Sequence, residues 1–327
     1  MRSDTLYAAL DLGTNNCRML VARPTGRGFR VVDAFSRVTR LGEGLGASGV
    51  LSEIAMDRTL DALDACAEKM ERHRVGRARL VATEACRRAV NGAEFTARIA
   101  RRIGLTPDII SPREEASLAL AGCASLLDPL VPWALVFDIG GGSTELVWVR
   151  NSPLGQQVMG VQSIPTGVVT LAEQWATELH SHAGYARVVD QIGSAFRPFE
   201  SLHTIGSLMG GNLVQMLGTS GTVTTLGALH LGLERYDRSR VDGLELGFTD
   251  IAAVTCQLAA MSHDERMEHP CIGPERADLV LAGCAILEAV CRLWPLGRLR
   301  VADRGVREGV LLAMMRDDGL TVQSGRT

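Results

Sequence analysis

The chain contains an internal repeat whose two copies stand a domain's length apart. ALDLGTNNCRMLVAR, close to the N-terminus, aligns without a gap on VFDIGGGSTELVWVR, so that Asp11 falls on Asp138 and Gly13 falls on Gly140. A repeat at this spacing is typical of two homologous lobes, because a solenoid repeats much shorter units many times. The sequence therefore predicts a duplicated fold.

Each copy opens a similar succession of strands and helices. Apolar runs separated by turn residues predict a β-meander over residues 6–11, 17–23 and 28–35. Ser52 then stands where a helix N-cap is expected, before apolar residues at spacings of four and three. Strands RARLVAT and PDIIS alternate with further helices, and the strands ALVFDIG, TELVWVR and QQVMGVQSIP restart the pattern. The alternation predicts an α/β protein with mixed sheets.

The best domain boundary is LLDPLVP, where an aspartate and two prolines interrupt the apolar pattern. With 327 residues, 46% of them apolar, the chain is large enough for two cores. We expect domains at residues 1–127 and 128–327 with a cleft between them. The closing helix, from about Arg304, is expected to pack back on a lobe, and we assign it to the first.

Composition argues against a membrane or a nucleic acid as partner. The most apolar helical run, ADLVLAGCAILEAVC, carries Asp278 and Glu288 and is shorter than the roughly 20 residues that cross a bilayer. The N-terminus has too short an apolar run for a signal-peptide core, and the eight cysteines form no CxxC pair. We expect a cytoplasmic protein. Because the net charge is −3, a polyanion would have to be met by a local cluster.

Two turns of the repeat are candidate phosphate cradles. DLGTNN and DIGGGSTE each place an aspartate at the end of an apolar strand, before a turn whose backbone N–H groups can face an anion. An Asp-Gly hairpin without a ligand is the ordinary alternative for either turn alone, but two copies favour the cradle. The residues in question are Thr14, Asn15, Asn16, Gly140, Gly141, Gly142, Ser143 and Thr144.

Two further segments carry candidate phosphate contacts. MLGTSGTVTTL runs from a strand through Ser220, Gly221 and Thr222 into a helix, which is either an anion site or a capped, close-packed turn. VATEACRRAVN places Arg87 and Arg88 at the predicted beginning of a helix. Basic residues fit that position badly unless an anion is bound, although an exposed surface pair is the alternative.

Carboxylates next to these turns are candidates for metal binding and for catalysis. Mg²⁺ on a phosphate chain prefers one or two carboxylates plus water and substrate oxygens, which makes Asp138 and Glu145 the best ligands. Asp11 would bind through water, or only stabilise its turn. In IISPREEA, Glu114 and Glu115 open a helix, where they either favour the helix dipole or include the base that activates an attacking water.

Together these segments resemble the exopolyphosphatase and guanosine pentaphosphate phosphatase family, Ppx/GppA, of the sugar kinase, Hsp70 and actin superfamily. The resemblance spans nearly the whole chain and rests on ALDLGTNN, RLGEGL, VATEACRRAVN, ISPREEA, VFDIGGGSTELV, LGTSGT, PERADLVLAGCAILEAV and VADRGVREGVLL, all in family order. It implies two ribonuclease H-like domains of the actin-like ATPase type.

The resemblance also implies an activity and its residues. The activity is Mg²⁺- or Mn²⁺-assisted hydrolysis of the end phosphate of inorganic polyphosphate, or of the 5′ γ-phosphate of guanosine pentaphosphate, a stringent-response nucleotide. Glu115 corresponds to the family's catalytic base, Asp138 and Glu145 to its metal and phosphate site, and Arg87 to its phosphate-binding arginine. A homodimer is expected from the family alone.

Two departures from the family pattern stand out. Pro112 occupies a position where the family has glycine, so that we expect a different loop geometry before Glu115 with activity retained. Longer relatives continue into an HD-like helical domain, whereas this sequence stops soon after VREGVLL; a short-chain preference or weaker processivity is the corresponding expectation. A small-molecule kinase or ATPase and a non-catalytic polyphosphate sensor are the alternatives from other functional classes.

Overall fold

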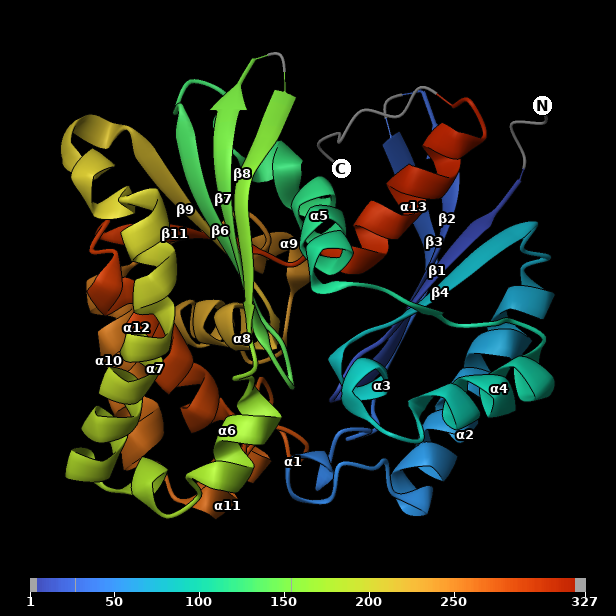
Figure 1. Cartoon of the computed structure of the whole chain (residues 1–327), viewed down its shortest axis with the longest axis horizontal. Coiled ribbons are helices and arrows are strands. Elements are labelled where there is room, and N and C mark those ends of the chain that lie inside the picture. Colours follow the sequence, from blue (N-terminus) through green and yellow to red (C-terminus); the bar gives the residue numbers. More distant parts are fainter. Residues whose placement is uncertain (1–4, 27, 154, 321–327) are drawn as a thin grey trace. The chain divides into compact units, whose positions relative to one another are not determined.

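The structure, a computed structural model, describes residues 5–26, 28–153 and 155–320, and the chain divides into two compact units. The first unit contains the chain up to Ser125 together with the segment from Arg304 onward, and the second runs from Leu126 to Asp303. Each unit is built on one mixed β-sheet, with five strands in the first and six in the second (Figure 1).

The first sheet begins with the predicted meander. Its strands are β1 (Tyr7–Leu12), β2 (Asn16–Thr25), β3 (Gly28–Val38), β4 (Arg77–Ala82) and β5 (Asp108–Ile109). They lie in the order β3-β2-β1-β4-β5, with β1 antiparallel to β2 and parallel to β4. The strand expected from PDIIS is only two residues long, and the helix that follows begins at Pro112.

Helices cover both faces of this first sheet. They are α1 (Leu45–Ser48), α2 (Glu53–Arg72), α3 (Glu84–Arg88), α4 (Gly92–Ile103), α5 (Pro112–Cys123) and α13 (Val306–Asp317). Alternate strand residues such as Leu10 and Met19 share a core with α2 and α4, while Ala9 and Leu20 share a second core with α5 and α13. The side-chain alternation of the strands thus produces three layers. The predicted N-cap is confirmed, because the Ser52 hydroxyl accepts a hydrogen bond from the Ala55 N–H.

The second sheet repeats the topology of the first. Its strands are β6 (Trp133–Ile139), β7 (Thr144–Ser152), β8 (Gly155–Ile164), β9 (Val214–Thr219), β10 (Glu245–Gly247) and β11 (Arg298–Ala302). The order β8-β7-β6-β9-β11 matches β3-β2-β1-β4-β5 strand for strand, and β10 adds one short edge strand that the sequence did not predict.

The helices of the second unit are α6 (Val168–Gln174), α7 (His182–His203), α8 (Gly221–His230), α9 (Arg238–Val241), α10 (Phe248–Ala260), α11 (His263–Glu268) and α12 (Val280–Leu293). Helices α7 and α12 lie side by side (Figure 1). Their apolar faces join the β6 and β7 residues Phe137, Leu146 and Trp148 in one core. The apolar run around Cys284 is therefore a buried helix, as its composition predicts.

The internal repeat extends to local irregularities of the backbone. Both meanders contain a β-bulge at the equivalent place, between Val21 and Ala22 in β2 and between Trp148 and Val149 in β7. Bulges bend a strand and re-aim its end. Their recurrence shows that the two sheets share strand curvature as well as strand order.

No helix in the described part of the chain is long and apolar enough to span a membrane. All eight cysteines are free thiols, and seven of them are buried.

Candidate active site

The first candidate turn is held in place by a loop that follows β3. The turn closes through a hydrogen bond from the Gly13 N–H to the Asn16 carbonyl at 2.9 Å. Three N–H groups of the loop Thr39–Glu43 donate to its outward carbonyls: Thr39 and Arg40 to Asn15 at 2.9 and 3.0 Å, and Gly42 to Thr14 at 2.9 Å. The turn is therefore fixed by backbone hydrogen bonds, and its own side chains do not have to hold it.

The second candidate turn has the same construction. Its closing bond runs from the Gly140 N–H to the Ser143 carbonyl at 2.9 Å. Val168 and Val169, at the start of α6, donate their N–H groups to the carbonyls of Gly140 and Gly141 at 2.9 and 2.8 Å. The bond from Val169 to Gly141 occupies the repeat position of the bond from Gly42 to Thr14. Both units thus hold an equivalent turn with an equivalent segment.

The carboxylates beside the two turns have different surroundings. In the second unit, Asp138 lies opposite Glu145 in the ladder of β6 and β7, and Glu145 is buried. The Glu145 carboxylate accepts hydrogen bonds from the hydroxyls of Ser143 at 2.7 Å and Ser163 at 2.8 Å. These two donors fix the orientation of the carboxylate.

In the first unit, Asp11 lies opposite Arg18, because arginine occupies the repeat position of Glu145. Burial raises the pKa of the Asp11 carboxyl, and the positive charges of Arg18 and Arg307 oppose that shift. Asp11 therefore has two cations near it as well as the Glu308 carboxylate, whereas the residue opposite Asp138 is itself a carboxylate. The second unit thus places two carboxylates, Asp138 and Glu145, where they could hold a divalent cation.

A metal would need oxygen atoms from outside the protein to complete its shell. Among the residues that the structure describes, no three His, Cys, Asp or Glu side chains are grouped to hold an ion. Mg²⁺ commonly takes one or two carboxylates and fills its shell with waters and substrate phosphates. The pair Asp138 and Glu145 fits that mode of binding.

Arg87 and Glu115 meet at the edge of the first sheet where β1, β4 and β5 end. Arg87 donates to the Glu84 carboxylate at 2.7 Å and to the Ile110 carbonyl at 2.6 Å, and it lies 3.3 Å from Glu115 Oε2. The side chains of Arg87 and Glu115 are 19% and 12% exposed, so both are largely shielded from bulk water. The structure brings the predicted phosphate-binding cation and the predicted base into contact.

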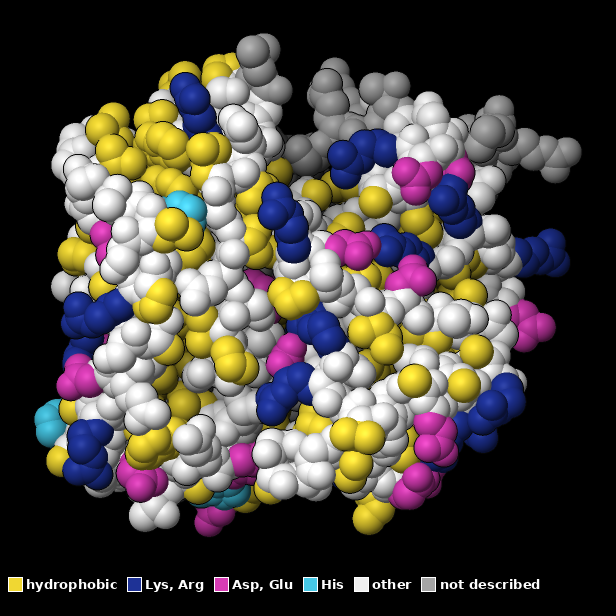
Figure 2. Space-filling view, in the orientation of Figure 1, with side chains coloured by type: hydrophobic (Ala, Val, Ile, Leu, Met, Phe, Trp, Pro, Cys, Tyr) yellow, Lys and Arg dark blue, Asp and Glu magenta, His cyan; other side chains and the backbone are white. Residues whose placement is uncertain are grey.

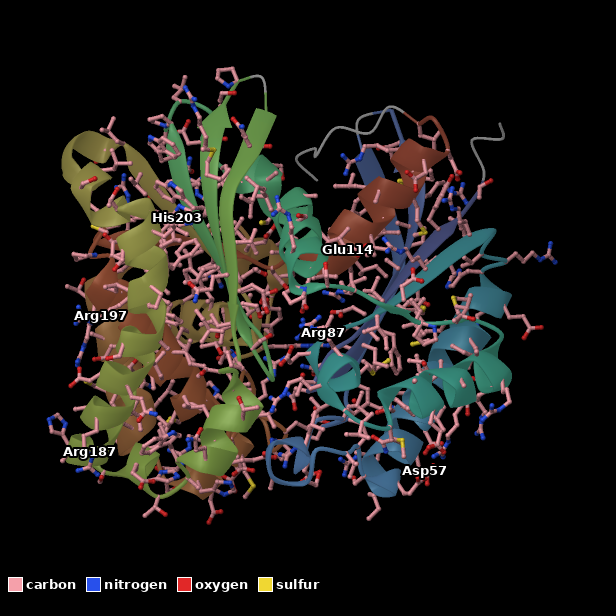
Figure 3. The ribbon with its side chains drawn as sticks, viewed as in Figure 1. Asp57, Arg87, Glu114, Arg187, Arg197 and His203 are labelled. Carbon is pink, nitrogen blue, oxygen red and sulfur yellow. The ribbon has the colours of Figure 1, made fainter. Side chains whose placement is uncertain are left out.

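The neighbouring glutamate is placed differently. Glu114 is 43% exposed and pairs with Arg79 at 2.8 Å, and Arg79 also binds Asp108. Figure 3 labels Glu114 on α5 and Arg87 on α3. The adjacent carboxylates of Glu114 and Glu115 thus have different partners. Of these two, it is Glu115 that contacts Arg87.

Pro112 is the first residue of α5, behind an N-cap formed by Ser111, whose hydroxyl accepts from the Glu114 N–H at 3.2 Å. Proline is favoured at this position, because the N–H it lacks has no partner within a helix. The geometry accommodates the departure from glycine.

The expectation that Arg87 and Arg88 begin a helix is wrong. They occupy the last turn of α3, which is only five residues long. A helix C-terminus attracts positive charge, so that the dipole argument for a bound anion does not apply there. The case for Arg87 rests instead on its contact with Glu115.

The third candidate turn lies next to the second. Asp138 pairs with Thr219 in the parallel ladder of β6 and β9, which brings the turn at Ser220 to the same sheet edge as Gly140–Thr144. The Ser220 hydroxyl caps α8 by accepting from the N–H groups of Thr222 and Val223 at 3.1 and 3.2 Å. Two of the N–H groups that an anion would use are therefore already engaged.

Arg276 is a neighbour of this turn that the sequence did not single out. It is half-buried and donates to the hydroxyl of Thr225 in α8 at 3.1 Å. The PERAD motif that contains Arg276 gave no chemical signal by itself, because the position of Arg276 beside α8 depends on the tertiary fold. Charge is otherwise dispersed: on the face in Figure 2, the described basic and acidic side chains are interspersed.

Comparisons with a family model, with known sequences and with solved structures all match this chain to one family. The model of the Ppx/GppA phosphatase family matches residues 20–318. Exopolyphosphatase 2 of Mycobacterium tuberculosis is 30% identical over 327 aligned residues, which cover 95% of this chain and 98% of that protein. The guanosine-5′-triphosphate,3′-diphosphate pyrophosphatase of Vibrio cholerae is 29% identical, over 96% of this chain and 60% of that protein. The crystal structure of the Aquifex aeolicus Ppx/GppA family member superimposes with a TM-score of 0.77 at 27% identity, over 96% of this chain and 98% of that one.

Proposed function

Because the chain belongs to the Ppx/GppA phosphatase family, we propose that it is an exopolyphosphatase that removes the terminal phosphate of inorganic polyphosphate. The observation that carries this proposal is the contact between Arg87 and Glu115. A guanidinium that binds a phosphate oxygen and a nearby carboxylate that accepts a proton can together support hydrolysis of a phosphoanhydride.

In the proposed reaction, Glu115 orients a water and accepts its proton as the water oxygen attacks the terminal phosphorus. The bond from that phosphorus to the bridging oxygen breaks, and the bridging oxygen stays on the shortened chain. The products are one orthophosphate and a chain shorter by one phosphate. Arg87 binds the terminal phosphate oxygens and offsets the charge that they gain in the transition state.

The glycine-rich turn of the second unit and the turn Gly13–Asn16 of the first are the proposed phosphate-binding segments. Their N–H groups and the side chains of Thr14, Asn15 and Asn16 would bind the chain behind the reacting phosphate. Asp138 and Glu145 would hold Mg²⁺ or Mn²⁺, and Glu145 is oriented for this by Ser143 and Ser163. When bound, the ion would neutralise negative charge on the phosphate chain.

Guanosine pentaphosphate is the second candidate substrate. It presents the same terminal anhydride, and a relative of 29% identity carries the name of a pyrophosphatase that acts on it. The residues described here contact only phosphate groups in the proposed mode, so they do not select between the two substrates.

The experiment is a comparison of phosphate release by the purified protein from long polyphosphate, short polyphosphate and guanosine pentaphosphate, each with and without Mg²⁺. We expect Mg²⁺-dependent release from polyphosphate at a kcat/KM above that for the nucleotide. A higher kcat/KM for guanosine pentaphosphate would reverse the assignment. No release from any substrate would contradict it, and in a separate assay with ATP, ADP formation that depends on a phosphate acceptor would indicate a kinase.

A further inference from the structure

Arg58 on α2 binds the loop that holds the first phosphate turn. Its Nε donates to the Thr39 carbonyl at 3.0 Å, and its Nη2 donates to the Arg40 carbonyl at 3.3 Å and to the Glu43 carboxylate at 2.8 Å. One planar guanidinium therefore spans the loop Thr39–Glu43 from its first residue to its last. An arginine suits this task because its donors stand in a rigid fork.

The same loop residues make the contacts to the turn. The N–H groups of Thr39 and Arg40 donate to Asn15, and that of Gly42 donates to Thr14. Gly42 also packs so closely that a Cβ added there would lie 2.2 Å from Cγ2 of Thr14. The loop cannot shift without moving the carbonyls of Thr14 and Asn15.

The loop has a conformation that requires outside support. Arg40 has a φ of 47°, in the left-handed region that residues with a Cβ seldom adopt. Such a residue persists when its surroundings over-determine it. Here the Arg40 N–H donates to the Asn15 carbonyl, and the Arg40 carbonyl accepts from the Glu43 N–H at 3.0 Å and from Arg58 at 3.3 Å, so that removal of the guanidinium takes away the bond that joins this residue to α2.

The second unit holds its equivalent segment by other means. There the Thr144 hydroxyl donates to the Thr166 carbonyl at 2.7 Å, and the Gly167 N–H donates to the Thr170 hydroxyl at 2.9 Å. Short side chains within the second turn and its own segment supply these bonds. In the first unit the Thr39 carbonyl, at the repeat position of Thr166, accepts instead from Arg58, a long side chain of a separate helix.

We propose that Arg58 is a positioning residue for substrate binding, which keeps the turn Gly13–Asn16 in its phosphate-binding form by holding the loop Thr39–Glu43. The inference rests on the proposed function in assigning the turn to phosphate. Because the turn would bind the chain equally before and during the reaction, loss of its form weakens binding without slowing the chemical step.

The test uses Arg58→Ala and Arg58→Lys, with Arg98→Ala as the matched control. Arg98 also binds α2, donating to Glu53 at 2.7 Å and to Asp57 at 3.1 Å, but it does not touch the loop. Figure 3 labels Asp57 on this helix. The lysine variant keeps the positive charge, which a polyanion could also sense, but a single ammonium cannot reproduce the fork.

The first readout is hydrogen exchange of the substrate-free protein. We expect the amides of Thr39, Arg40 and Gly42 to exchange about tenfold faster in both Arg58 variants and at the wild-type rate in Arg98→Ala, as loss of about 1.4 kcal/mol of local stability implies. Unchanged exchange in Arg58→Ala would overturn the proposal. This readout does not depend on any enzymatic activity.

The second readout is the KM and kcat of phosphate release. We expect KM to rise about tenfold in both Arg58 variants, with kcat within about a factor of two of wild type. A wild-type KM in Arg58→Lys would show that charge alone matters and would overturn the positioning role. If the amides exchange faster while wild type releases no phosphate, the proposed function fails and the structural role of Arg58 stands.

Discussion

Arg87 approaches the Glu115 carboxylate with both of its terminal nitrogens, at 3.3 and 3.4 Å, while its bond to Glu84 is much shorter at 2.7 Å. Glu84 is thus the firm partner, and the contact with Glu115 is loose enough for phosphate oxygens to compete for the guanidinium. Two carboxylates share one cation, and their unequal distances separate the residue that holds Arg87 from the residue that we propose to act on water.

Glu84→Gln is predicted to lower kcat. Without the Glu84 charge, Arg87 would pair more closely with Glu115 and make it a weaker base, because an adjacent cation favours the charged carboxylate. We expect a fall in kcat of several-fold to about tenfold, a small part of the roughly 10²–10⁴ that a general base contributes. Steady-state kinetics against Glu94→Gln, an exposed glutamate of α4, checks this; equal kcat values for the two variants would refute the role given to Glu84.

Glu145→Gln is predicted to raise the concentration of Mg²⁺ that supports half-maximal activity. The amide keeps the shape of the side chain but removes one of the two proposed anionic ligands, and Mg²⁺ binds in proteins chiefly through carboxylates. We expect an increase of about tenfold or more, equivalent to roughly 1.4 kcal/mol. Titration with Mg²⁺ measures it, and Glu268→Gln, an exposed glutamate of α11, is the control. A Glu145 variant with the wild-type Mg²⁺ requirement would exclude Glu145 as a ligand.

The charge of Asp33 is predicted to make the free energy of unfolding depend on pH. The hydrogen bond from Lys69 lowers the pKa of its carboxyl, burial opposes this shift, and His73 at 2.9 Å adds to it. A carboxylate with a lowered folded-state pKa stabilises the fold above its unfolded pKa of about 3.9, and that contribution disappears as pH falls through the folded-state value. Asp33→Asn should lower the free energy of unfolding by about 1 kcal/mol at neutral pH.

The difference between wild type and Asp33→Asn should therefore shrink below about pH 4. Urea unfolding at several pH values measures it. A difference that stays constant down to acid pH would mean that the charge of Asp33 contributes nothing to stability.

Alanine substitutions of Gly309 in α13 and of Gly193 in α7 are predicted to have opposite effects on stability. A Cβ on Gly309 would lie 2.0 Å from the Leu118 carbonyl oxygen of α5, whereas one on Gly193 would have nothing within 4 Å. Gly309→Ala should therefore cost about 2–3 kcal/mol through overpacking. Gly193→Ala should stabilise the protein by about 0.5–1 kcal/mol, because alanine favours the helix. Urea denaturation of both variants checks this, and a stable Gly309→Ala would show that α5 and α13 are free to separate.

Much of the fold could be predicted, because it depends on local patterns. The meander and α2 follow from apolar periodicity and from the Ser52 cap, and the repeat predicted that two units share one strand order. Family membership and the expected α/β fold of two actin-like domains are confirmed by the match over residues 20–318 and by the Aquifex aeolicus structure.

The site was predicted less completely, because its features depend on contacts between distant residues. Asp11 and Asp138 occupy the same repeat position, yet only the fold shows that one faces Arg18 and the other Glu145. Apolar periodicity did not show that α3 ends at Arg88. Because Arg87 and Arg88 therefore lie in the last turn of a helix, the helix dipole gives no argument for a bound anion there. Arg58 connects helix α2 to the loop 39–43 by hydrogen bonds, and nothing in the sequence pairs these two segments.

The most direct test of the account is single-turnover phosphate release by Glu115→Gln, with Glu114→Gln as its neighbour control and polyphosphate binding measured for both. Removal of a general base commonly costs a factor of about 10²–10⁴. We predict a loss of that size in Glu115→Gln with unchanged binding, and less than about a twofold change in Glu114→Gln, whose exposed carboxylate pairs with Arg79. A Glu115→Gln enzyme that turns over at the wild-type rate would contradict the account.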